Sequence, residues 1–251
     1  MMKFYAYCLS DELTGASVEG LAGVGGAGVR LLAVGGAAPA AGVFAVLSEF
    51  GGARVPVTRE NLLAHNRVNA HVLARTTPLP FRFGTLADEA RLSAYVAANG
   101  AALAEGFARV RGCVEMGVKV RLGAGAEAGT KGSEDGAVEV KVEDAAGVGR
   151  GTAFLLAKRR EILGEEALKA RAEEAAARLA ECVEGLARSA DVRLSPEGPI
   201  VLRAAHLVAR GDVAEYRARA RDLGSRLAGV HLLASGPWPP YSFGVAGGPA
   251  G

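Results

Sequence analysis

A glycine run at residues 23–28 has the spacing of a cofactor-binding fingerprint. Its residues match the pattern G-x-G-x-x-G, and Glu49 follows about twenty residues later. That fingerprint binds a dinucleotide when it joins a strand to a helix, because the helix N-terminus then faces the pyrophosphate. Here a strand pattern at 29–34 follows the run, and residues 17–22 lack the pattern of a preceding strand. We therefore expect a flexible loop and no bound cofactor.

The other reactive side chains lack the spacing of a metal or catalytic site. His65 and His71 would lie about 120° apart on a helix, so they cannot hold one metal ion together. The acid pairs at 88–89 and 165–166 stand near predicted helix starts, where negative charge favours the helix dipole. The sequence contains neither a P-loop nor a nucleophile elbow. These patterns predict a protein with no metal and no enzymatic activity.

Cysteine usage and charge limit the remaining classes. Cys8, Cys113 and Cys182 are far apart and odd in number, which is typical of buried thiols in a reducing compartment. With 29 basic and 27 acidic residues the net charge is +2, which argues against nucleic-acid binding. No apolar run approaches the ~18 residues of a membrane span. We expect a cytoplasmic protein.

The elements that would position these groups begin with three strand patterns, at 3–9, 29–34 and 43–48, of which the last two form a hairpin or a close relative of one. Thr58 is expected to cap a helix that runs to about residue 75. Asn66 lies in the middle of its predicted apolar face, either hydrogen-bonded in the core or under a partner. The rest of that face is Leu62, Leu63, Ala70 and Leu73.

Further along, Pro78 and Pro80 impose an extended segment through residue 83. Arg82 is expected either to anchor a backbone turn with its guanidinium or to hold a partner's carboxylate. A helix from about 85 to 110, broken near 100, precedes a period-two strand at 112–122 with Glu115 on its solvent face. We expect an α+β N-terminal domain at 1–122, a ferredoxin-like antiparallel sheet with helices on one face.

Residues 123–150 are rich in Gly and Ala, which predicts a linker with a short strand pattern at 138–142. A C-terminal α+β domain at 151–251 then opens with a long charged helix at 152–188. Strands near 191–194, 200–210 and 230–234 and a helix at 212–227 complete it. An apolar stripe from 168 to 186 steps by three and four, so it belongs to the core or fills the groove of another helix.

A stiff aromatic segment at 235–243 precedes the last residues. It holds the only tryptophan, Trp238, together with Tyr241, Phe243 and three of the ten prolines. Because proline fixes φ and restricts the residue before it, these rings project from a backbone with few alternatives. Such a segment either docks on its own domain or presents a rigid aromatic ridge to a partner.

Two segments resemble signatures of the gas vesicle protein L/F family. Residues 236–243, Gly-Pro-Trp-Pro-Pro-Tyr-Ser-Phe, resemble the family's closing motif, and 78–85 resemble its Pro-x-x-Arg-Phe-Gly-Thr motif, with His71 upstream. Residues 4–7, 45–48 and 151–156 are similar too, so the resemblance covers about 3–243. It marks the following as structural or partner-binding residues: Pro80, Arg82, Phe83, Gly84, Trp238, Tyr241 and Phe243.

The resemblance implies a gas vesicle accessory protein that helps the hydrophobic shell protein assemble or is a minor vesicle component. Its implied partners are the shell protein and other accessory proteins, and a monomer is favoured. A scaffold that gathers accessory proteins through the long helix is an alternative. A nucleotide-binding enzyme that uses the 23–28 loop is a remote one. The residues do not separate the L branch from the F branch.

Overall fold

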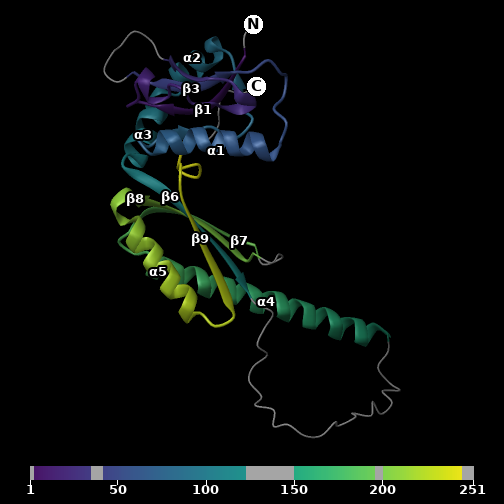
Figure 1. Cartoon of the computed structure of the whole chain (residues 1–251). Coiled ribbons are helices and arrows are strands. Elements are labelled where there is room, and N and C mark those ends of the chain that lie inside the picture. Colours follow the sequence, from purple (N-terminus) through teal and green to yellow (C-terminus); the bar gives the residue numbers. More distant parts are fainter. Residues whose placement is uncertain (1–2, 35–41, 123–149, 196–199, 245–251) are drawn as a thin grey trace.

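The computed structural model describes residues 3–34, 42–122, 150–195 and 200–244, with the backbone alone for residue 16 and for 150–165. Its strands form two antiparallel sheets, which occupy the two ends of the molecule in Figure 1. Helices pack on both sheets. This confirms the predicted α+β class. The predicted linker and its short strand pattern lie outside the described residues, and the domain limits at 122 and 151 stay predictions.

The first sheet has the strand order β2-β3-β1-β4, and β5 also pairs with β1. Its strands are β1 (Phe4–Ser10), β2 (Val29–Ala33), β3 (Phe44–Glu49), β4 (Leu79–Pro80) and β5 (Leu86–Ala87). All seven residues of the central strand β1 are buried. Ala6 and Leu9 face one hydrophobic cluster and Tyr5 and Tyr7 face another, with a register shift between Ala6 and Cys8. The predicted hairpin of β2 and β3 is confirmed.

Helices cover both faces of this sheet, rather than the single face expected. The helices are α1 (Arg59–Leu73), α2 (Glu89–Ala98) and α3 (Gly100–Val110). Leu92 of α2 and Phe107 of α3 join the cluster on the Ala6 side, whereas Val68 of α1 joins the cluster on the Tyr5 side. The alternation of β1 residues between two apolar clusters requires cover on both sides.

The expected apolar face of α1 is wrong. Leu62, Leu63, Asn66 and Ala70 are exposed, and of the expected face only Leu73 is buried. The reading of Asn66 as a core residue is therefore wrong, and its position under a partner stays a prediction. The helix buries instead a face that contains two polar residues, His65 and Asn69. A helical wheel that scores only apolar residues misses this face. His65 and Asn69 can be buried there because they form hydrogen bonds with residues from other parts of the chain. The predicted cap is confirmed, since Thr58 Oγ1 accepts a hydrogen bond from Asn61 N at 3.2 Å.

The second sheet has the order β7-β8-β6-β9. Its strands are β6 (Cys113–Leu122), β7 (Ala187–Leu194), β8 (Leu202–Ala209) and β9 (Val230–Trp238). The strand expected at 112–122 in the first sheet is therefore β6, paired with β8 and β9 of the second sheet. Local sequence predicts that β6 is a strand, but its pairing partners lie at least 82 residues further along the chain (Val120 with Leu202), which a local pattern does not report.

Helices α4 (Arg150–Cys182) and α5 (Val213–Arg226) pack on one face of this sheet. Ala172, Ala175 and Leu179 of α4 share a cluster with Tyr216 of α5. The predicted apolar stripe therefore belongs largely to the core, although Leu168 at its start is exposed. Figure 1 shows α4 extending past the edge of the sheet and β9 running back toward the first sheet, so that the tail lies beside α1.

Candidate functional site

The tail contacts α1 through a chain of hydrogen bonds. The hydroxyl of Tyr241 lies 3.0 Å from Nε2 of His65 and accepts a hydrogen bond from Asn69 Nδ2 at 3.2 Å. On the other side of the imidazole, Nδ1 of His65 lies 2.8 Å from the hydroxyl of Tyr5 in β1. His65 and Asn69 are four residues apart, which places both on one face of α1. The tail is thus connected through α1 to the central strand.

Burial keeps this cluster neutral. His65 is 3 % exposed, and burial lowers the pKa of its imidazole to about 4. Burial also raises the pKa of the Tyr5 and Tyr241 hydroxyls above their usual range. At neutral pH none of these groups carries charge, so the cluster provides hydrogen bonds and not ionic or acid–base chemistry. Oδ1 of Asn69 makes no hydrogen bond to any residue described.

The 80–84 segment meets the same cluster. The ring of Phe83 lies edge-on to Tyr5 at 6.1 Å and to His65 at 5.8 Å between centroids. Gly84 N donates to the Tyr5 hydroxyl at 3.2 Å, and Gly84 has a φ of 87°, which favours glycine. Both predicted signature segments therefore converge at one junction, although nothing in their spacing along the chain indicates it.

Arg82 does not play the first of its two predicted roles, that of anchoring a backbone turn with its guanidinium. Its guanidinium is exposed and forms no hydrogen bond or ion pair with the described residues. The turn is held instead by the Arg82 carbonyl oxygen, which accepts hydrogen bonds from Thr85 N at 3.3 Å and Thr85 Oγ1 at 2.8 Å. The second role, binding a partner's carboxylate, stays a prediction.

A buried carboxylate connects the tail to β6. Glu115 accepts hydrogen bonds from Ser242 N at 2.7 Å and from Ser242 Oγ at 3.1 Å. Burial raises the pKa of the Glu115 carboxyl, and the two Ser242 hydrogen bonds offset part of that rise. The sequence places Glu115 on a solvent face, and this is wrong because the tail covers that end of the strand. A lone acid in an alternating strand gives no signal for it.

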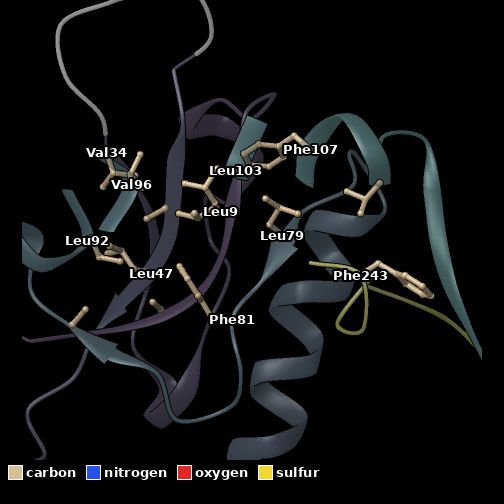
Figure 2. Close-up of a cluster of buried hydrophobic side chains, with 14 of the residues drawn as sticks. Leu9, Val34, Leu47, Leu79, Phe81, Leu92, Val96, Leu103, Phe107 and Phe243 are labelled. Atoms are coloured by element: carbon tan, nitrogen blue, oxygen red, sulfur yellow. The ribbon is translucent and has the colours of Figure 1, made fainter. Parts of the chain in front are cut away.

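The three aromatic residues of the tail divide into two groups. Phe243 is 7 % exposed and belongs to the cluster that includes Leu79 and Phe81 (Figure 2). Trp238, the last residue of β9, is 45 % exposed, and its Nε1 donates to Ser235 Oγ at 3.3 Å. Of the two predicted roles for the tail, docking describes Phe243 and, through its hydroxyl, Tyr241, although the Tyr241 side chain is still 39 % exposed. Trp238 remains accessible to a partner.

A separate apolar groove of about 260 Å³ lies between α4 and β7. Leu179 and Val183 of α4 and Val192 of β7 are among its lining residues. Val192 is 47 % exposed and Leu194, two residues further along β7, is 39 % exposed. β7 pairs with β8 alone, so its other edge is free within the described part of the chain. An exposed apolar edge strand is a template for pairing with another chain.

The family model for the gas vesicle synthesis protein GvpL/GvpF matches residues 3–244. The chain belongs to the GvpL/GvpF family. It is 30 % identical to gas vesicle protein L of Streptomyces sp. (strain CB03234) over 96 % of this chain and 93 % of that protein. The family resemblance expected from the two signature segments is confirmed.

Two crystal structures of GvpF share the fold. GvpF of Anabaena sp. PCC7120 superposes with a TM-score of 0.76 at 16 % identity, over 99 % of this chain and 98 % of that one. GvpF of Microcystis aeruginosa gives 0.72 at 15 % identity, over 97 % and 99 %. At such low identity these two likenesses establish the architecture alone.

In this GvpL/GvpF-family chain the glycine run forms the short 3₁₀ turn η2 (Val24–Gly26) and leads into β2, so it does not open an α-helix. Val24 N donates to the Tyr7 hydroxyl at 2.7 Å, and a Cβ on Gly23 would lie 2.0 Å from that oxygen. Gly23 therefore permits a close approach to Tyr7, and the geometry of a dinucleotide site is not present. Across the described ranges no group of three or more His, Cys, Asp or Glu is placed to hold a metal ion, and no helix is suited to cross a membrane.

Proposed function

We propose that this GvpL/GvpF-family protein is a cytoplasmic, non-catalytic assembly factor that binds the hydrophobic gas vesicle shell protein before it polymerises. The observation that carries the proposal is the free edge of β7, where Val192 and Leu194 are exposed beside the α4 groove. A shell subunit outside its polymer would present apolar surface and strand edges, which aggregate in water. A free apolar edge is complementary to such a surface.

The geometry of β7 suits an added strand. Backbone N–H and C=O groups along its free edge are available to pair with an extended segment. Val192 and Leu194 lie opposite Ala204 and Leu202 of β8, residues of the α4 cluster, so their side chains point toward the α4 side of the sheet. A strand added at this edge would place every second side chain beside the groove, which favours an apolar, alternating segment.

A charge inserted into the groove tests the proposal. Purified wild-type protein is expected to slow the aggregation of shell protein at an equimolar ratio, as followed by light scattering. Val192→Lys should lose this effect because a cation at the groove cannot be desolvated. Val57→Lys is the matched control, because Val57 is exposed in the segment that precedes α1.

Comparison of the two variants distinguishes binding at the β7 edge from nonspecific adsorption of shell protein. Circular dichroism would first show that both remain folded. If wild-type protein left aggregation unchanged, or if both variants lost the effect equally, binding through the β7 edge would be wrong.

The scaffold alternative is supported by α4. This helix of 33 residues extends past the sheet in Figure 1, and Leu168 on it is exposed. A scaffold that works through α4 should bring two copies or two accessory proteins together, whereas a shell-binding factor should be a monomer. Multi-angle light scattering of the purified chain distinguishes a stable dimer from a monomer, and Leu168→Glu should abolish a dimer that uses this face.

A further inference from the structure

The face of the second sheet opposite α4 and α5 carries a row of positive charge. Arg203 of β8 lies directly opposite Arg193 of β7 on one side and Lys119 of β6 on the other. Because neighbouring residues of these strands, such as Val118 and Leu202, point into the α4 and α5 cluster, the three basic side chains point the other way. They form one row across three strands, and all three are exposed.

The row continues toward the edge strand β9. Arg121 lies two residues beyond Lys119 on the same face of β6 and opposite His231 of β9. Both of these side chains are exposed. We call the five residues the basic face. They are Lys119, Arg121, Arg193, Arg203 and His231.

Within the described residues the charges of the basic face are largely unneutralised. Arg193 has an ion pair with Asp191 on its own strand, with Nη2 and Oδ2 2.8 Å apart. Lys119, Arg121 and Arg203 form no ion pair with any residue that the structure describes. Like charges directly opposite one another in an antiparallel sheet are destabilising. The fold places two such cross-strand pairs in one row, Arg193–Arg203 and Arg203–Lys119, and an anionic partner would relieve the repulsion in both.

An apolar depression lies beside the basic face. Its volume is about 570 Å³, and Lys119, Arg121 and His231 line it together with apolar side chains. The most exposed of these is Leu233 of β9, at 63 %. β9 lies at the end of the sheet order, so its outer edge is free in the described structure. The surface thus combines cations, an accessible leucine and a strand edge.

We propose that the basic face binds an extended acidic segment of a partner protein, with carboxylates on Lys119, Arg203 and Arg121 and an apolar side chain on Leu233. This surface is on the opposite face of the sheet from the α4 groove, so the proposal does not depend on shell-protein binding. A peptide fits better than a nucleic acid for two reasons. The net charge of the chain is only +2, and the side chain opposite Lys119 on β9 is the apolar Leu233, whereas Trp238 lies five residues further along that strand.

A short synthetic peptide that alternates Glu and Val is the probe for the full-length protein. Isothermal titration calorimetry measures the binding, because the only tryptophan, Trp238, pairs with Glu115 four residues from Lys119 along β6 and lies outside the basic face. Arg203→Glu should weaken peptide binding at least about tenfold. The same variant should raise the midpoint of denaturant unfolding, because it replaces two like-charge contacts by two opposite-charge ones. Arg67→Glu, an exposed change of the same charge on α1, is the matched control.

Wild-type protein is expected to bind the Glu–Val peptide, less tightly at high salt, and not to bind a Lys–Val peptide. The proposal would be overturned if the Glu–Val peptide failed to bind, or if Arg67→Glu and Arg203→Glu weakened it equally. Preferential binding of a single-stranded oligonucleotide would also overturn it. A final experiment uses a variant in which the acidic residues at 127–144 of this chain are replaced by their neutral amides. Peptide binding that appears only in that variant would assign the face to the chain's own acidic segment and not to a partner.

Discussion

The hydroxyl of Tyr241 lies 3.0 Å from Nε2 of His65, although 176 residues separate them in the sequence. This contact connects the end of the second sheet's last strand to the helix that covers the first sheet. Ser242 makes a second connection on the neighbouring side, through the Glu115 carboxylate of β6. The tail therefore bonds to α1 on one side and to β6 on the other.

Removing the Tyr241 hydroxyl should destabilise the protein without altering its fold. Tyr241→Phe deletes the oxygen that accepts from Asn69 Nδ2 and lies against His65 Nε2. Leaving buried polar groups without a partner costs about 1–3 kcal/mol. Urea unfolding at pH 7 should show a lower midpoint with an unchanged slope. An unfolding free energy equal to that of wild type would show that solvent replaces the hydroxyl.

The two aromatic rings that flank Tyr241 should differ in their effect on stability. Phe243→Ala removes a ring that is almost fully buried and should cost about 3–5 kcal/mol. Trp238→Ala removes a ring that is partly exposed and should cost clearly less. Thermal unfolding of both variants tests this order. A Trp238 variant as unstable as the Phe243 variant would contradict the division of the tail into a docked part and an accessible part.

Local features of this fold are predictable from sequence because their causes are local. The Thr58 cap, the interruption between α2 and α3 at Asn99, and the alternation of β6 follow from neighbouring residues. The assignment of β6 to the second sheet cannot be predicted in this way, because its partners β8 and β9 come from distant parts of the chain.

Prediction of the candidate site from sequence is limited in the same way. The family resemblance identifies Phe83, Gly84, Tyr241 and Phe243 as signature residues. It does not show that they lie together in the fold. The sequence gives no sign that His65 joins them, because the role of a buried imidazole is recognisable only once its partners, Tyr5 and Tyr241, are in place. Glu115 is assigned to the solvent face for the same reason, since its donor Ser242 is 127 residues away.

Acid should weaken the fold through His65. Its folded pKa of about 4 lies below the ordinary value of 6.5, so the unfolded chain binds a proton more readily than the folded one. The associated stability is complete above pH 6.5 and is lost as the pH falls toward 4. Between pH 7 and 5 this group alone should remove about 2 kcal/mol. Burial lowers the pKa of His206 as well, which acts in the same direction.

Urea unfolding at pH 7 and pH 5 measures this loss, and His65→Gln isolates the contribution of one group. The variant should be less stable than wild type at pH 7, because Gln reproduces the imidazole's contacts poorly. It should also lose less stability on acidification. Equal losses in wild type and variant would assign the pH dependence to other groups.

Glu115 should have the opposite dependence on pH. Because burial raises its folded pKa above the ordinary value of 4.5, ionisation is less favourable in the folded protein than in the unfolded chain. Its unfavourable contribution is absent below pH 4.5 and grows as the pH rises through the folded pKa. Glu115→Gln has no charge to desolvate, and its amide can still accept from Ser242 N and donate to Ser242 Oγ. The variant should therefore gain stability relative to wild type between pH 4 and pH 7, as measured by urea unfolding at both. A relative loss over that range would mean that the Ser242 hydrogen bonds outweigh the cost of burying the charge.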